Sequence, residues 1–247
     1  VDDLNITSTE TLCGGSGGGY YIDAQYIDHE MYFTTCADVL HMMKMDLSDL
    51  DSPILEDGLS EDHYSGFNEF RIIDNVLYVL DYNRYIRAYD YNIDESLIIG
   101  FTISDSTEEY SFLTYFDSID TIHSSEQGSI LYIVGKKANQ TYLYTFDVSN
   151  TDDVLLLDQE SLDGNGYKIN TFGSYVYAVS DEGDFYIINA SENSNLRVES
   201  QIQILLQDTA NQTYETIELE YENGYVFIAF LNQTASLSYF YIYDVAN

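Results

Sequence analysis

Residues 174–191 read SYVYAVSDEGDFYIINAS, and this stretch sets the pattern for the whole chain. Tyr175–Val179 is a run of β-branched and aromatic residues, which is typical of a short strand. The polar residues that follow include Gly183, which can adopt the positive φ that a tight hairpin requires. Phe185–Ile188 then forms a return strand, and Asn189 ends it. The stretch therefore predicts an antiparallel β-hairpin.

The same hairpin recurs along the chain, and two landmark positions mark each copy. An aromatic residue lies within the second strand of each copy, and an Asp or Asn ends the third strand. The aromatic landmarks are Tyr32, Tyr78, Tyr132, Tyr177 and Phe227, and the strand-end landmarks are Asp46, Asp90, Asp147, Asn189 and Asp244. Both sets recur about every 49 residues, a period typical of propellers and solenoids. We expect each strand-end landmark to stabilise a turn by accepting hydrogen bonds from backbone N–H groups.

Each copy divides further into four strands of falling hydrophobicity, as in a propeller blade. No long stretch has the 3.6-residue periodicity of an amphipathic helix, which excludes an α-solenoid. The sequence therefore predicts an all-β protein, a single domain over residues 1–247 that forms a five-bladed β-propeller of four-stranded antiparallel blades. The blades are expected near residues 20–56, 67–102, 116–158, 167–204 and 214–245, the last together with 4–12.

The fifth copy ends after its third strand, and the missing strand is found at the other end of the chain. Residues 147–154 read DVSNTDDV, where the third strand continues toward the fourth. Residues 244–247 (DVAN) followed by 1–4 (VDDL) reproduce this phrase. We therefore expect residues 4–12 to form the outer strand of the last blade. This strand could close the ring of its own chain or pair with a neighbouring copy, which would build a head-to-tail homopolymer.

The phrase made by the second and third strands resembles the LVIVD-repeat family, whose name describes an apolar run that ends in Asp. The phrases are ILYIVGKKANQTYLYTFDVSN (130–150), YVYAVSDEGDFYIINAS (175–191), YVFIAFLNQTASLSYFYIYDVAN (225–247), VLYVLDYNRYIRAYDYN (76–92) and EMYFTTCADVLHMMKMDLS (30–48). The resemblance implies a β-propeller of a kind often found on secreted or cell-surface proteins, and it implies no shared activity and no catalytic residues. Two positions depart from the family pattern, since Asn189 replaces the terminal Asp and Cys36 lies where a plain turn is expected.

The chain is strongly acidic, with 43 Asp and Glu residues against 8 Lys and Arg residues and a net charge of −35. Such a surface repels nucleic acids and anionic membranes, so neither is expected as a partner. No run of about 18 apolar residues is present, and therefore no membrane span is expected. The chain begins with Val1 and carries no visible signal peptide, which indicates a processed form or a segment of a longer protein.

Two kinds of motif favour an extracellular or cell-surface location. Acceptor motifs for N-glycosylation are present at Asn5, Asn139, Asn189, Asn211 and Asn232, and we expect N-linked glycans on expected turns or strand ends. Cys13 and Cys36 would form a disulfide that ties the glycine-rich segment 13–19 to the first blade. A pair of free thiols is the alternative.

No motif in the sequence defines a catalytic or metal site. His29, His41, His63 and His123 lack metal-ligand spacing, and the acidic loop 46–51 lacks the Gly and Glu of an EF-hand. We therefore expect a non-enzymatic structural or interaction glycoprotein of a surface layer, matrix or filament, which binds copies of itself or other extracellular proteins and needs no cofactor. One alternative is a propeller that binds a ligand or glycan, with calcium as a candidate cofactor. The other is a glycoside hydrolase with a carboxylate pair in the central cleft.

Overall fold

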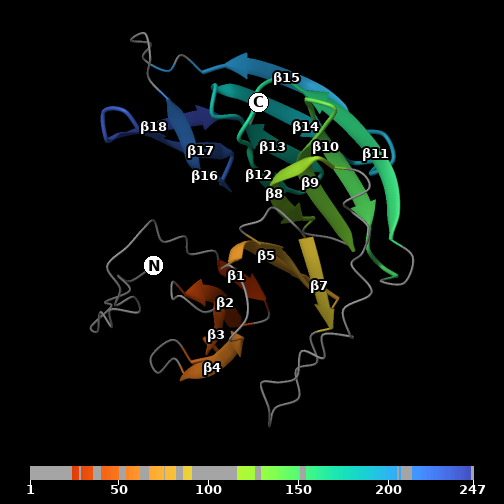
Figure 1. Ribbon diagram of the computed structural model, residues 1–247, viewed down its shortest axis with the longest axis vertical. Helices are drawn as coiled ribbons and strands as arrows, with labels where there is room; N and C mark the ends of the chain where they lie inside the picture. Colours follow the sequence, from red (N-terminus) through yellow and green to blue (C-terminus); the bar gives the residue numbers. More distant parts are fainter. Residues whose placement is uncertain are drawn as a thin grey trace.

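The computed structural model of the chain describes residues 24–27, 29–35, 40–49, 54–61, 67–74, 76–81, 86–90, 116–125, 129–150, 154–204, 206 and 213–245. All of the regular secondary structure in these ranges consists of β-strands (Figure 1). The strands are β1 (Ala24–Ile27), β2 (Glu30–Thr35), β3 (Leu40–Asp46), β4 (Ile54–Glu61), β5 (Phe67–Ile73), β6 (Val76–Asp81), β7 (Ile86–Asp90), β8 (Ser118–Ser124), β9 (Ile130–Lys137), β10 (Gln140–Asp147), β11 (Leu155–Leu162), β12 (Lys168–Phe172), β13 (Tyr175–Val179), β14 (Asp184–Asn189), β15 (Arg197–Gln203), β16 (Tyr214–Glu222), β17 (Tyr225–Asn232) and β18 (Leu237–Asp244). Within the same ranges, no helix has the length and apolar character needed to cross a membrane.

In the described ranges the strands form five antiparallel sheets, and strands that follow one another in sequence pair with one another. The first to fifth sheets are β1–β4, β5–β7, β8–β11, β12–β15 and β16–β18. They follow one another round the molecule in Figure 1, from the first sheet at the lower left to the fifth at the upper left. This arrangement confirms the expectation of an all-β fold built from repeated antiparallel hairpins.

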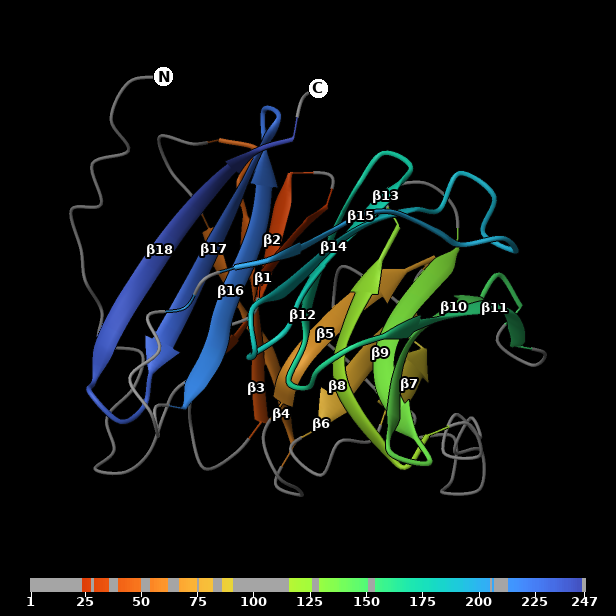
Figure 2. The ribbon, with the colours of Figure 1, turned by 90° about the horizontal axis from the view of Figure 1, so that it is seen from above.

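Each sheet contacts the next through its first strand. β1 lies against β5, β5 against β8, β8 against β12, and β12 against β16, and we call these five strands the inner strands. The fourth strands β4, β11 and β15 lie at the opposite edge of their sheets. Burial of the side chains decreases toward this outer edge. In the fourth sheet the second strand, β13, is mostly buried, whereas the fourth strand, β15, is mostly exposed. Figure 2 shows the fifth sheet with β16 toward the other sheets and β18 at the outside.

Alternate residues of a strand pack against different neighbouring sheets, because successive side chains point to opposite faces. In the fourth sheet Tyr177 and Val179 enter a core shared with the fifth sheet, whereas Val176 and Ala178 enter a core shared with the third. We call the side toward the next sheet the forward face and the opposite side the backward face. Tyr78 lies on the forward face of the second sheet, in the core that joins it to the third. The aromatic landmark therefore anchors a sheet to the next one.

Some strands have the predicted bounds and others extend past them. β5 spans Phe67–Ile73, as predicted. Among the fourth strands, expected at 54–56, 154–158 and 196–204, β4 continues to Glu61 and β11 to Leu162, whereas β15 lies within its expected range. An outer strand meets water along much of its length, so a fall in hydrophobicity does not mark its end. The predicted strands at 4–12 and 97–102 lie outside the described residues.

The strand-end landmarks form the same turn in several sheets. Oδ1 of Asp46, Asp147 and Asn189 accepts a hydrogen bond from the backbone N–H two residues further on, over 2.8, 2.9 and 2.9 Å. The residue directly after a landmark donates its own N–H to the carbonyl that precedes the second strand. These bonds run from Leu47 to His29, from Val148 to Ser129, from Ala190 to Ser174 and from Val245 to Gly224. The landmark therefore stabilises the turn that follows the third strand. The side chain of the remaining landmark Asp90 lies outside the described residues.

Candidate functional site

Polar side chains occupy the inner strands at the position opposite each aromatic landmark. The register pairs Gln25 with Tyr32, Arg71 with Tyr78, His123 with Tyr132, Asn170 with Tyr177 and Glu220 with Phe227. Directly paired residues share a face of the sheet, so these polar residues lie on forward faces. The preceding forward-face positions are also polar, and they are Glu69, Thr121, Lys168 and Glu218. Because the inner strands contact one another, these side chains gather where the sheets meet.

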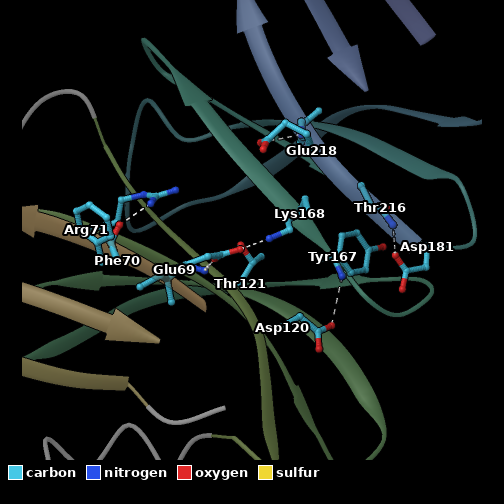
Figure 3. A network of polar contacts seen from close by, with 12 residues as sticks. Glu69, Phe70, Arg71, Asp120, Thr121, Tyr167, Lys168, Asp181, Thr216 and Glu218 are labelled. Atoms are coloured by element: carbon cyan, nitrogen blue, oxygen red, sulfur yellow. Dashed lines mark hydrogen bonds and ion pairs between the residues drawn. The ribbon is translucent and has the colours of Figure 1, made fainter. Parts of the chain in front are cut away.

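Glu69 joins three sheets through one buried carboxylate, as Figure 3 shows. One oxygen accepts hydrogen bonds from Thr121 Oγ1 at 2.6 Å and from the backbone N–H of Ile122 at 2.9 Å, both on β8. The other oxygen forms an ion pair with Lys168 on β12. Burial alone raises the pKa of Glu69, but the charges of Lys168 and Arg71 outweigh burial and hold that pKa below its ordinary value. The carboxylate is therefore ionised at neutral pH and holds β5, β8 and β12 together.

Arg71 places a second positive charge among these residues. The charge of its guanidinium acts to lower the pKa values of Glu69, His123 and Glu220, which belong to three different sheets. Burial, followed by the charge of Arg71, lowers the pKa of His123 to about 3. The imidazole is therefore neutral at physiological pH. Its Nδ1 lies 2.9 Å from the carbonyl oxygen of Ser124, which assigns the N–H to Nδ1 and leaves Nε2 as an acceptor.

Other side chains bridge successive sheets by hydrogen bonds to the backbone. The amide of Gln25 on β1 accepts the N–H of Ile72 at 2.7 Å and donates to the Ile72 carbonyl at 3.3 Å. Asp181 accepts the N–H of Thr216 on β16 over 2.6 Å (Figure 3). Burial raises the pKa of Asp181 to about 6, although its bonds to Thr216 oppose the change. The contact between the fourth and fifth sheets thus includes a carboxyl group that titrates at mildly acidic pH.

Acidic side chains surround a glycine turn at 163–166, which connects β11 of the third sheet to β12 of the fourth. Gly166 has a φ of +64°, and a Cβ there would lie 1.8 Å from Oδ2 of Asp181. A Cβ on Gly164 would lie within 3.0 Å of carboxylate oxygens of Glu182 and Asp184. Within the part of the chain that the structure describes, no group of three or more His, Cys, Asp or Glu side chains could hold a metal ion. These acidic side chains pack against the turn at 163–166, and glycine is needed at 164 and 166 because a Cβ would clash with them.

The glycosylation motifs differ in accessibility. Asn139 is exposed at a turn, with a φ of 66°. Asn189 is half-buried, and its Nδ2 donates to Glu199 at 3.1 Å. Asn232 is buried, and its Oδ1 accepts two backbone N–H groups of the following turn, which fixes Nδ2 inside the protein. Asn139 is therefore the most accessible of the three. The remaining predicted modification sites lie outside the described residues, and they are Asn5, Asn211, Cys13 and Cys36.

The fold is shared with solved propeller structures. The chain resembles the β-propeller domain of Cps50 (Swd1) from Myceliophteria thermophila, with a TM-score of 0.61 and 9% identity, over 92% of this chain and 70% of that one. It also resembles the periplasmic gluconolactonase PpgL of Pseudomonas aeruginosa, with a TM-score of 0.57 and 11% identity, over 96% and 75% of the two chains. These likenesses show that the chain has a β-propeller fold, as the repeat pattern predicts.

The comparisons leave the activity open. One of these two propellers is named for an enzyme and the other is not, and a fold by itself does not determine a function. No protein-family model matches the chain, and no curated protein does either. The resemblance to the LVIVD-repeat family is therefore supported only at the level of the propeller fold.

Proposed function

We propose that the protein is a non-enzymatic interaction module of an extracellular or cell-surface structure such as a surface layer, matrix or filament. The observation that carries this proposal is the bonding of Glu69, whose two oxygens hold strands of three different sheets together. The charged groups where the sheets meet therefore contribute to rigidity. A rigid body of this kind suits the display of contact surfaces on its loops and outer strands.

The bonding of the carboxylates supports this role over glycoside hydrolysis. A glycosidase needs one carboxyl group that donates a proton and a second that acts as base or nucleophile. Glu69 is held ionised by Lys168 and Arg71, so it is unsuited to proton donation. Burial raises the pKa of Glu220, which accepts a hydrogen bond from Asn170 Nδ2 at 3.1 Å. Glu69 is nevertheless a poor base or nucleophile to pair with it, because both oxygens of Glu69 already bond within the protein.

We also propose that the five sheets are the five blades of one propeller, and that residues 4–12 complete the last blade. In the described residues β18 is an edge strand, whereas β3, β10 and β14 each pair with a fourth strand. The N–H of Val245 bonds to Gly224 as the matching residues do in sheets where the chain continues into a fourth strand. The geometry at the end of β18 therefore supports an added outer strand, from the same chain or from a neighbouring copy.

A measurement of native mass tests the proposed function. The protein purified from its source is measured by light scattering before and after treatment with an N-glycosidase. We expect a loss of glycan mass together with a complex heavier than one 28.2 kDa chain and its glycans. A single chain at every concentration, or a chain without any glycan, would contradict the proposal. Asn139→Gln should remove one glycan, whereas Asn232→Gln should remove none.

One observation favours a ligand- or glycan-binding propeller as the second candidate. Phe172 is 45% exposed and stacks on Tyr221, with ring centroids 4.0 Å apart. Asn170 and Glu220, which bond to each other, lie close to these rings in sequence on the same two strands. A sugar ring can stack on an exposed aromatic side chain and bond to such polar groups. A glycan array probed with the protein and with Phe172→Ala tests this candidate, which predicts a signal that the variant loses.

A further inference from the structure

The forward face of the last sheet is exposed where the forward faces of earlier sheets are covered. Phe240 lies four residues before the landmark Asp244, and its side chain is 64% exposed. Residues at the same position in earlier sheets are buried, with exposures of 7% for Ile86, 0% for Leu143 and 0% for Phe185. Ile242, two residues further along β18, is 56% exposed. Two large apolar side chains thus face solvent at the outer strand of this sheet.

In the earlier sheets the next sheet supplies the cover. Phe185 stacks on Tyr243 of the fifth sheet, with ring centroids 5.7 Å apart. Leu143 belongs to a core that also contains Tyr186 of the fourth sheet. No sheet follows the fifth within the described residues. Within the described residues, no following sheet therefore covers Phe240 and Ile242.

The backward face of the first sheet is also less covered than its counterparts. Met31 directly precedes the landmark Tyr32 and is half-buried. The residues that precede the landmark in the other sheets are 0% exposed, and they are Leu77, Leu131, Val176 and Val226. The forward face of the fifth sheet at Phe240 and the backward face of the first sheet at Met31 are therefore both more open than the matching positions in the other sheets.

The exposed face of the last sheet also carries a row of carboxylates. Glu218, Glu220 and Glu222 alternate along β16, and all are exposed. Burial, followed by the charges of Glu218 and Glu222, raises the pKa of Glu220. The register makes rows that read acidic, apolar, apolar across the sheet, namely Glu220–Phe227–Ile242 and Glu218–Ala229–Phe240. The face thus combines an apolar outer part with an acidic inner part.

We propose that the forward face of β16–β18 is a docking surface for a partner protein whose apolar side chains are flanked by lysine or arginine. The proposal rests on the proposed function as an interaction module and names the surface and the chemistry of the partner. The partner buries Phe240 and Ile242, and its cations meet the carboxylates of β16. A second copy of the chain fits poorly, because its net charge of −35 repels this acidic face.

A short peptide tests this chemistry directly. The probe is a decapeptide of alternating leucine and lysine, and decapeptides of leucine with glutamate and of serine with lysine are the controls. Titration calorimetry at low ionic strength should show binding of the leucine–lysine peptide and at least tenfold weaker binding of both controls. Phe240→Ser with Ile242→Ser should weaken binding at least tenfold. Glu218→Gln with Glu220→Gln should weaken it and reduce its dependence on salt.

A matched pair of charge changes at and just before β15 controls for net charge. Glu192→Gln with Glu199→Gln alters two exposed carboxylates, one in the turn before β15 and one on β15, and should leave binding unchanged. The same affinity for all variants, or no binding by any, would overturn the proposal. If Phe240→Ser with Ile242→Ser lowered the urea midpoint as far as Leu143→Ala, which truncates a buried counterpart of Phe240, the proposal would also be overturned, since the face would then be covered by the chain itself.

A measurement of the mass of the protein in solution distinguishes self-association from the binding of a different partner. A concentration-dependent dimer that Phe240→Ser with Ile242→Ser abolishes would assign the face to a second copy and overturn the proposal. The native-mass measurement is independent of the peptide assay. If the native protein forms a glycosylated complex and the peptide does not bind, the assignment of this docking surface is wrong while the proposed function stands.

Discussion

At the scale of single residues, the buried carboxylate of Glu69 bonds to strands of two other sheets. Glu69→Gln removes the negative charge that compensates Lys168, so we expect the free energy of unfolding to fall by about 2–4 kcal/mol. Because the pKa of Glu69 is lowered, its contribution is present above the ordinary value and is lost as the pH falls through the lowered one. Urea unfolding at pH 7 measures the change. Glu199→Gln, on an exposed strand, should change stability by less than about 0.5 kcal/mol.

Asp181 has the opposite dependence on pH. Its pKa is raised from 3.8 to about 6, so the folded protein holds a proton that the unfolded chain releases between these values. The stability contributed by that proton is therefore lost as the pH rises from about 4 to about 6. We expect the stability of the wild type, relative to Asp181→Asn, to fall by about 1–2 kcal/mol over this window, after allowance for solvent screening. Urea unfolding at several pH values tests this, and parallel curves for the two proteins would show that Asp181 does not titrate there.

The strand-end landmark allows a test on a single residue, for which another landmark of the same chain serves as the control. Asp147→Ala should cost about 1 kcal/mol, because the N–H of Ser149 loses its acceptor. Asp147→Asn should restore most of this loss, since Asn189 makes the same bond at the same place in the fourth sheet. Thermal unfolding of the three proteins measures the difference. Equal stability for the Ala and Asn variants would mean that the hydrogen bond does not stabilise the turn.

Residues were predictable where the structure repeats and were missed where it does not. A turn needs its acceptor in every sheet, so the landmark could be recognised from sequence alone. The inner-strand residues Glu69, Arg71 and Lys168 differ from one sheet to the next, and they interact only because distant strands meet. The signal that could have found them was a pair of polar residues on the inner strand, one opposite the aromatic landmark and one two positions before it.

At the scale of elements, third strands that look alike in sequence differ in their neighbours. Leu143 on β10 and Phe240 on β18 occupy matching positions, yet the first is 0% exposed and the second is 64% exposed. Leu143→Ala should therefore lower the free energy of unfolding by about 2–4 kcal/mol. Phe240→Ala should lower it by less than about 1 kcal/mol. Similar losses in urea unfolding would show that β18 is covered in solution.

The strand pattern could be derived from local sequence, whereas the limits of several strands could not. β5 and β13 match their predicted spans, because alternation and turn residues mark both ends. β11 continues through Gln159 and Glu160, beyond the end expected at residue 158. Those side chains are tolerated because the strand is held by its ladder with β10, a contact that local sequence does not show.

At the scale of the whole molecule, repetition made the propeller fold predictable. A period of about 49 residues, with two landmarks in register, requires a unit that packs against copies of itself. The exposure of the last sheet could not be predicted in the same way, because it depends on contacts between the two ends of the repeat array. The function likewise depends on a surface, and a repeat pattern describes mainly the core.

The account depends most on one long-range pairing, the addition of residues 4–12 to β18. Nuclear Overhauser effects between backbone amides of a dilute, deuterated sample report such pairing directly, since neighbouring strands lie about 4.8 Å apart. We predict cross-strand contacts between residues 4–12 and Leu237–Asp244, within one chain if they persist on dilution and between neighbouring copies if they form only as the concentration rises. The absence of such contacts, with random-coil shifts for residues 4–12, would contradict the account.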